Sequence, residues 1–368
     1  MTAAFDQVLD RALAQIRPDV RAAHAYVVQS SQGLLKMDAM ENPYRLPPAL
    51  QQALGERLAA VALNRYPAER TAELARALAR HAGAGDDVGV TLGNGSDEII
   101  GLLSIAVARP GATVLAPVPG FVMYEAFARQ QRLDFVGVPL RPDDFQLDEA
   151  AMLAAIDKHQ PALIYLAYPN NPTATLWDAA VIERIAQAAP GLVVMDEAYQ
   201  PFVDQVAGTA SLALMARQPN VLVMRTMSKF GLAGVRIGYL LGAAALVEQI
   251  EKLRPPYNIS VLNAEAALFA LEHADVYAAQ AAELRQQRER LFQALQALPG
   301  VSPWPSQGNM ILARVRDAAA TFGALKARGV LIKNVSALHP MLENCLRFTV
   351  GAPDENTRLL AELQACLP

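Results

Sequence analysis

The 368-residue sequence is poor in the residues that mark a metal centre, a disulfide-rich fold or a membrane span. Its two cysteines, Cys345 and Cys366, are too few for a disulfide framework or a cysteine-bound zinc site. The five histidines are scattered and show no metal-ligand spacing. The longest apolar run, residues 99–108, is far shorter than the roughly 20 residues that span a bilayer. We therefore expect neither a bound metal nor a membrane helix.

The sequence also lacks a large excess of either positive or negative charge. The chain has 32 Lys and Arg against 36 Asp and Glu, a net charge of −4, and no long basic or acidic run. This pattern argues against a nucleic-acid or membrane-surface partner. Small phosphorylated or carboxylated substrates stay compatible with it, because a pocket can be basic in an acidic chain. The first residues lack the basic-then-apolar order of a signal peptide, so we expect a soluble, cytoplasmic protein.

What the sequence does contain is a large apolar core in a regular pattern. Hydrophobic residues make up 53% and charged residues 18%, which is typical of a globular protein. Short β-branched runs alternate with helical segments, which predicts an α/β fold with a mostly parallel, buried sheet flanked by helices. The predicted strands are 88–92, 113–116, 162–166, 192–195 and 221–224, and the helices between them include 97–108, 124–131 and 179–189.

The C-terminal third has a different, α+β pattern. A long helix is predicted at 276–298, followed by strands at 310–315, 330–333 and 345–350 and a helix at 318–327. Because Pro255-Pro256 interrupts the preceding pattern, we expect a large domain at 46–260 and a small domain formed by 1–45 and 261–368. The first 45 residues are predicted to hold one short helix and an extended arm that packs on the C-terminal lobe.

One lysine follows the last of the predicted parallel strands. Lys229 lies beside Ser228 and small residues, where a ligand could reach its amine. Amine catalysis requires a pKa lowered by burial or by nearby positive charge, which Arg236 could supply together with a fork for phosphate. The alternative is a surface lysine beside a glycine-rich turn.

Polar residues also follow two other predicted strands. Asp196 could hold a cationic ring nitrogen, and Tyr199 could reach a ring hydroxyl, although Asp196 could instead cap the next element. After the strand at 162–166, the turn Asn171-Pro172 could point an amide into a cleft or be a turn only.

The segment from Gly93 to Glu98 joins a strand to an apolar helix. Its glycines, among them Gly95, let the backbone approach a ligand, and the helix N-terminus offers N–H groups to a phosphate. Ser96 could simply be the N-cap, with Asp97 stabilising the helix dipole. Parallel strands end at one edge of a sheet, so all four segments are predicted to meet there.

Together these segments resemble fold-type I pyridoxal-phosphate aminotransferases over nearly the whole chain. Asn171-Pro172-Thr173, residues 196–199, Ser228-Lys229 and residues 236–238 appear in the family's order. The resemblance implies pyridoxal 5'-phosphate as cofactor, with Lys229 forming an internal aldimine and shuttling the proton. It assigns the remaining cofactor contacts to Tyr66, Gly95, Ser96, Asp97, Phe121, Asn171, Asp196, Tyr199, Ser228 and Arg236.

The same resemblance gives these residues separate roles. Asp196 pairs with the pyridine nitrogen, and Asn171 and Tyr199 contact the ring hydroxyl. Phe121 stacks on the ring. Tyr66 crosses from a partner subunit to the phosphate, which implies a homodimer with shared active sites. The phosphate end is surrounded by Ser96, Asp97, Ser228 and Arg236.

Within the family, the sequence most resembles the histidinol-phosphate aminotransferases, on residues 38–43, 65–67, 308–312 and 346–351. This implies ping-pong transamination between a phosphorylated amino alcohol and the glutamate/2-oxoglutarate pair, in histidine biosynthesis. The implied substrate-binding residues are Tyr26, Glu41, Asn42, Asn309, Lys333 and Arg347. The alternatives are an aromatic or broad-specificity aminotransferase, a threonine-phosphate decarboxylase and, least favoured, a cofactor-binding regulator.

The chain departs from the family pattern at four places. Ala174 replaces a glycine after Asn171-Pro172-Thr173, so the turn must accept a Cβ atom. Arg236 lies one residue closer to Lys229 than in many members. Phe121 replaces a frequent tyrosine, and Lys333 replaces a second arginine that some members use for the substrate.

Overall fold

The computed structural model describes residues 2–25, 29–85, 87–203 and 205–367, in two compact units, 1–33 and 34–368. The first unit has two helices, α1 (Thr2–Ala14) and α2 (Pro18–Ala22), so the prediction of one short helix was wrong. Pro18 explains the second helix, because its fixed φ suits the first turn. Among the described residues, no helix is long and apolar enough to cross a membrane.

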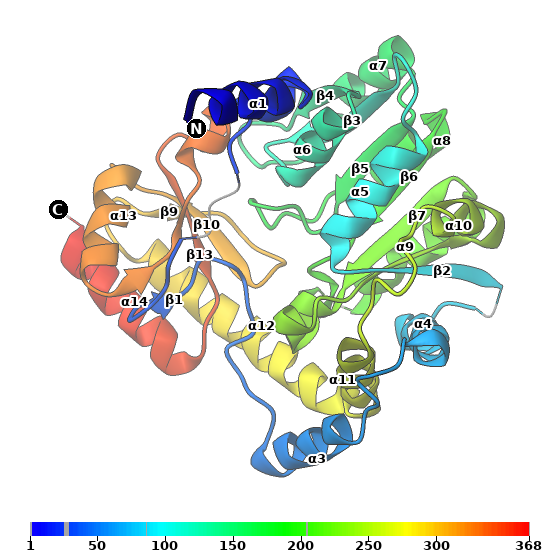
Figure 1. Ribbon diagram of the computed structural model, residues 1–368. Helices are drawn as coiled ribbons and strands as arrows, with labels where there is room; N and C mark the ends of the chain where they lie inside the picture. The colour runs from blue at the N-terminus through cyan, green and yellow to red at the C-terminus, as the bar shows by residue number, and fades with distance from the viewer. Residues whose placement is uncertain (1, 26–28, 86, 204, 368) are drawn as a thin grey trace. The chain divides into compact units, whose positions relative to one another are not determined.

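A seven-stranded sheet in the order β2-β8-β7-β6-β5-β3-β4 organises the second unit. Figure 1 shows β5, β6 and β7 side by side within this sheet. β8 is antiparallel to both of its neighbours, and the other pairings along the sheet are parallel, which confirms the mostly parallel sheet. The strands are β2 (Val88–Gly93), β3 (Thr113–Val118), β4 (Asp134–Pro139), β5 (Leu163–Ala167), β6 (Leu192–Asp196), β7 (Val221–Thr226) and β8 (Gly238–Ala243).

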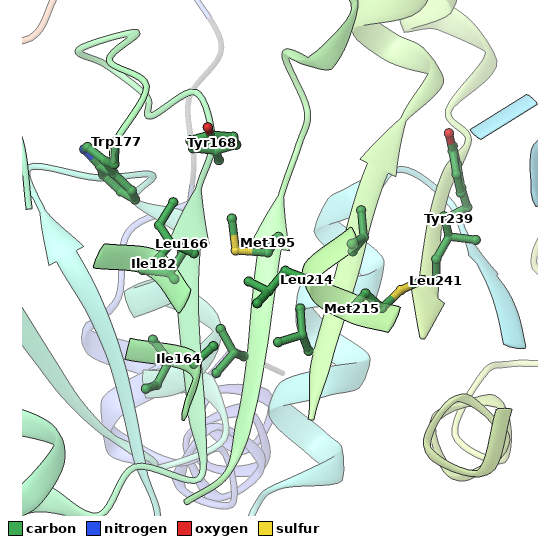
Figure 2. Close-up of a cluster of buried hydrophobic side chains, with 14 of the residues drawn as sticks. Ile164, Leu166, Tyr168, Trp177, Ile182, Met195, Leu214, Met215, Tyr239 and Leu241 are labelled. Carbon is green, nitrogen blue, oxygen red and sulfur yellow. The ribbon is translucent and has the colours of Figure 1, made fainter. Parts of the chain in front are cut away.

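Helices cover both faces of this sheet, which explains why its strands are apolar throughout. Along β5, Leu163 and Tyr165 belong to one apolar core, while Ile164 and Leu166 belong to another. Figure 2 shows the second core, where Ile182 of α8 and Leu214 of α9 pack against the strands. The helices of this core are α4 (Ala68–Ala82), α7 (Glu149–His159), α8 (Ala179–Ala188), α9 (Gln205–Arg217) and α11 (Val261–Glu272). The opposite face carries α5 (Ser96–Ala106), α6 (Met123–Gln130) and α10 (Ala244–Glu251).

The C-terminal third forms a separate core around a small antiparallel sheet in the order β12-β13-β10-β9. The predicted strand 330–333 is split, because β11 (Val330–Leu331) pairs with β1 (Leu35–Lys36) whereas β12 (Lys333–Asn334) pairs with β13. The domain boundaries at 45–46 and 260–261 stay a prediction, since residues 34–368 form one compact unit. The remaining elements are α3 (Pro48–Ala59), α12 (Ala274–Gln296), β9 (Ser302–Pro303), β10 (Met310–Arg314), α13 (Ala318–Ala327), β13 (Cys345–Thr349) and α14 (Pro353–Cys366).

Two strands of the large sheet, and the short strands β1 and β9, have no counterpart in the sequence-based prediction. β4 is one of the two edge strands of the large sheet, and it begins at the exposed Asp134. β8 begins at Gly238, where a side chain would collide with the backbone of Gly95 and Ser96, at 2.5 Å from Ser96 N. Glycine is therefore required at the start of β8, because that strand passes close behind the loop after β2.

Candidate active site

A cavity of about 360 Å³ lies at the carboxyl ends of β2, β5, β6 and β7. Short connections after these strands bring their polar side chains to one place, as expected for an open α/β sheet. Ten of the residues singled out from the sequence line it: Glu41, Ser96, Asp97, Phe121, Asn171, Asp196, Tyr199, Ser228, Lys229 and Arg236.

Lys229 lies in a π-helical turn, Ser228–Leu232, directly after β7. Its side chain is partly buried, and Nζ donates a hydrogen bond to the carbonyl oxygen of Ala39 at 2.7 Å. Burial lowers the pKa of the Lys229 amine to about 7, and the charge of Arg347 acts in the same direction. The alternative of a surface lysine is therefore wrong, and a large share of this amine is neutral near pH 7.

Asp196 is a buried carboxylate at the end of β6. Its Oδ1 accepts a hydrogen bond from the Ala198 N–H at 3.1 Å, and its Oδ2 accepts one from Tyr124 Oη at 2.6 Å. Burial raises the pKa of Asp196 to about 6, so the carboxyl group is mostly ionised at pH 7. Asp196 also lines the cavity, where a buried negative charge can bind a cationic N–H group.

Asn171 links Tyr199 to Arg347 through two hydrogen bonds. Asn171 Nδ2 donates to Tyr199 Oη at 3.1 Å, and Arg347 Nη1 donates to Asn171 Oδ1 at 2.7 Å. Arg347 is buried in the middle of β13 and also donates to the carbonyl of Asp38 at 2.8 Å. The small sheet thus delivers one guanidinium to the residues that line the cavity.

The N-terminus of α5 and Arg236 form a cradle suited to an anion. Gly95, with φ +83°, lies at the N-cap, so the interpretation of Ser96 as N-cap was wrong; Ser96 is the first residue of the helix and lines the cavity. A Cβ atom on Gly95 would lie 2.5 Å from Arg236 Nη2, which shows how closely the guanidinium approaches this loop. Arg236 Nη1 also donates to Ser228 Oγ at 3.4 Å. Helix N–H groups, a guanidinium and hydroxyls are typical phosphate ligands.

The connection between Lys229 and Arg236 consists of two short helical turns. The π-helical turn is followed by a 3-10 turn, Ala233–Val235, and Arg236 adopts a left-handed conformation with φ +56°. This conformation, uncommon for a residue with a Cβ atom, brings the guanidinium back to the loop after β2. Ala174 likewise is left-handed, with φ +56°, and fully buried.

Four other residues singled out from the sequence do not line the cavity: Tyr66, Asn42, Asn309 and Lys333. Tyr66 is 76% exposed and stacks on Tyr257 with ring centroids 4.3 Å apart. Asn42 donates to Gln280 and accepts from the Tyr44 N–H, while Asn309 donates to the Met40 carbonyl. Lys333 is the cross-strand partner of Arg347. Tyr26 lies outside the described residues.

Sequence patterns missed three contributors to this site. Tyr124 reaches Asp196 from α6, and its position three residues after Phe121, at the start of a helix, was the available signal. The carbonyl groups of Asp38 and Ala39 accept hydrogen bonds from Arg347 and Lys229. A sequence pattern reports side chains, so it held no signal for these two backbone contacts.

Comparisons with known proteins identify relatives that match this chain over nearly its whole length. A protein from Methylibium petroleiphilum named histidinol-phosphate aminotransferase is 62% identical over 355 residues, covering 96% of this chain and 94% of its own length. One of the same name from Paracidovorax citrulli is 61% identical, covering 98% of this chain and 99% of its own length.

A solved structure described by the same name, from Sinorhizobium meliloti and in complex with pyridoxal-5'-phosphate, superposes with a TM-score of 0.84 at 26% identity. It covers 96% of this chain and 97% of its own. Residues 32–363 match the family model described as aminotransferase class I and II. The chain therefore belongs to the family of class I and II aminotransferases.

Proposed function

We propose that this protein transfers an amino group between histidinol phosphate and 2-oxoglutarate, with pyridoxal 5'-phosphate bound at Lys229. One observation supports this proposal: a single cavity contains a lysine amine whose pKa is lowered to about 7, a buried carboxylate and an anion cradle. The substrate is proposed because the relatives named histidinol-phosphate aminotransferase are about 60% identical over nearly the full chain.

The residues around the cavity fit this cofactor group by group. The cradle at the α5 N-terminus, with Ser228 and Arg236, suits the phosphate. Asp196 suits the ring nitrogen, and the pair of Asn171 and Tyr199 suits the ring hydroxyl. When bound, the cofactor supplies an aldehyde that links to amines and a ring that withdraws electrons.

The protein supplies positioning and proton transfer. Lys229 Nζ would hold the cofactor and, as a free amine, would take the proton from the substrate carbon that bears the amino group. Burial raises the pKa of Tyr199, so its hydroxyl stays a hydrogen-bond donor. Arg347 receives the anionic end of either substrate, since one guanidinium binds a carboxylate or a phosphate. One site serving both substrates in turn implies ping-pong kinetics.

The half-reaction tests this function directly. The purified protein is loaded with pyridoxal 5'-phosphate, and histidinol phosphate is expected to bleach the cofactor's visible absorbance, which 2-oxoglutarate restores. Parallel assays with phenylalanine and tyrosine give relative kcat/KM values, and phosphothreonine with a CO2 readout tests decarboxylation. If histidinol phosphate leaves the spectrum unchanged while another amine bleaches it, the substrate proposal is wrong.

We expect Arg347→Lys to weaken the binding of both substrates. Lysine keeps the charge but loses the fork that donates to Asn171 and to the Asp38 carbonyl. KM for histidinol phosphate and for 2-oxoglutarate should each rise about 10- to 100-fold, the value of one or two charge-assisted hydrogen bonds. Steady-state kinetics measure this. Equal KM values in variant and wild type would remove Arg347 from the substrate site.

The rate of cofactor attachment should follow the pKa of Lys229. Only the neutral amine attacks the aldehyde, so the attachment rate to the apoprotein should rise with pH around a midpoint of about 7. Arg347→Leu removes a charge that lowers this pKa, so the midpoint should move to higher pH. Stopped-flow absorbance measures both. An unchanged midpoint in the variant would contradict the electrostatic role of Arg347.

We also propose a homodimer with shared sites, supported by the exposed, stacked pair of Tyr66 and Tyr257. If Tyr66 serves the partner's site, inactive Tyr66→Ala and Lys229→Ala chains should complement each other. Refolding them together at equal amounts should restore about a quarter of wild-type activity, because half the dimers are hybrids with one intact site. Activity equal to the parental mean would indicate that Tyr66 serves its own subunit. The cytoplasmic location stays a prediction.

A further inference from the structure

Tyr124 contacts the carboxylate that the proposed cofactor depends on. Its side chain is 2% exposed, and Oη donates to Asp196 Oδ2 at 2.6 Å. The second oxygen, Oδ1, accepts from the backbone N–H of Ala198. Both oxygens therefore have a donor in the protein, and the orientation of the carboxyl group is fixed before any ligand enters.

Packing fixes the Tyr124 ring independently of Asp196. Its ring stacks on Tyr165 with centroids 4.3 Å apart and planes at 1°, and meets the Phe121 ring edge-on at 5.5 Å and 85°. The Tyr165 hydroxyl donates elsewhere, to the Ile100 carbonyl at 3.4 Å. The two stacked tyrosines thus differ in what their hydroxyls bind, and the donor at Asp196 is preorganised by aromatic contacts.

The hydrogen bond from Tyr124 opposes the effect of burial on the protonation of Asp196. Burial raises the pKa of Asp196, while the hydrogen bonds from Tyr124 and from the Ala198 N–H lower it. Burial raises the pKa of Tyr124 well above its ordinary value, so the hydroxyl keeps its proton. The titratable groups that act on Asp196 besides Tyr124 are Asp97 and Glu197, and those that feel its charge are Tyr165 and Tyr199.

We propose that Tyr124 is a positioning residue of the amino-transfer site, whose hydroxyl keeps Asp196 ionised and oriented toward the ring nitrogen of the cofactor. The proposal rests on the function proposed above. Phe121 lies two residues before α6, and Tyr124 is the second residue of that helix. The Tyr124 N–H donates to the Phe121 carbonyl at 3.3 Å, so one turn brings both aromatic side chains to the cavity.

A pair of matched variants and a pair of ligands test this role. Tyr124→Phe and Tyr165→Phe each delete one buried hydroxyl from the same stack, but only Tyr124 donates to Asp196. Binding to the apoprotein is measured for pyridoxamine 5'-phosphate and for its analogue with carbon in place of the ring nitrogen. Neither ligand links to Lys229, so the readout is independent of activity.

We expect Tyr124→Phe to bind pyridoxamine 5'-phosphate about tenfold more weakly and the carbon analogue almost as well as wild type, since a hydrogen bond to a charged group has roughly this worth. Tyr165→Phe should bind both ligands with the same affinity as wild type. Loaded Tyr124→Phe should lose about tenfold in kcat with KM nearly unchanged. In an Asp196→Asn background, Tyr124→Phe should add no further loss.

The outcomes separate this inference from the proposed function. If wild type binds neither ligand, the proposed function fails. If wild type binds and Tyr124→Phe weakens both ligands equally, or behaves like Tyr165→Phe, the positioning role is wrong. Should Tyr124→Phe not fold, Tyr124→His keeps a ring donor, and it is expected to retain most of the preference for the nitrogen-containing ligand. Loss of that preference in Tyr124→His would also overturn the role.

Discussion

Lys229→Ala is expected to abolish covalent attachment of the cofactor and to reduce amino transfer by at least about 10⁴-fold. Two functions are lost together, the amine that links to the aldehyde and the base that moves the proton. The visible absorbance of the linked cofactor and the transamination rate measure them separately. Exposed Lys326, near the end of α13, is the matched control, and Lys326→Ala should retain both signals.

The folded state should tolerate this change, because burying the Lys229 amine disfavours its charged form and so costs free energy of folding. Its lowered pKa means that the unfolded chain binds more protons between pH 7 and 10, so the wild-type stability contribution of Lys229 rises with pH over that window. The free energy of unfolding is measured for the apo forms of wild type and Lys229→Ala. The stability of the variant relative to wild type should be greatest at or below pH 7. A variant that keeps the linked-cofactor spectrum would refute the assignment of Lys229.

Arg225→Met is expected to lower the free energy of unfolding by about 3–5 kcal/mol, more than the other variants do, because it leaves Glu197 buried without its cation. Arg225 Nε donates to Glu197 Oε2 at 2.8 Å, and the two side chains are only 7% and 1% exposed. This pair ties the end of β6 to the end of β7, next to Asp196 and Lys229. Denaturant unfolding measures the loss, and the melting temperature should fall by about 5 °C.

Two further variants identify the cause of that loss. Arg217→Met breaks a solvent-exposed pair with Glu183 and should cost under about 1 kcal/mol. Adding Glu197→Leu to Arg225→Met should recover part of the stability, because the unpaired charge is removed. Without the cation the pKa of Glu197 rises further, so the deficit should shrink as pH falls. If Arg225→Met alone lowers the free energy of unfolding by less than about 1 kcal/mol, the pair of Arg225 and Glu197 is not needed for stability.

The sequence alone determined five of the seven strands of the large sheet and the segments that line the site. Five apolar runs and the helices between them were correctly predicted, because strands buried on both faces must be apolar throughout. Residues 93–97, 171, 196–199 and 228–229 converge because their strands end at one edge of the sheet. The edge strand β4 and the glycine-bounded β8 were missed because their patterns depend on neighbouring strands more than on local preference.

Only the tertiary structure decided how these residues act on one another. Tyr124 supports Asp196 across 72 positions, and Arg347 reaches Asn171 across 176 positions, distances over which a local pattern holds no information. The carbonyl groups of Asp38 and Ala39 that engage Arg347 and Lys229 carry no side-chain signal at all. Protonation also belongs to this level, because the lowered pKa of Lys229 comes from burial and charge that exist only in the folded chain.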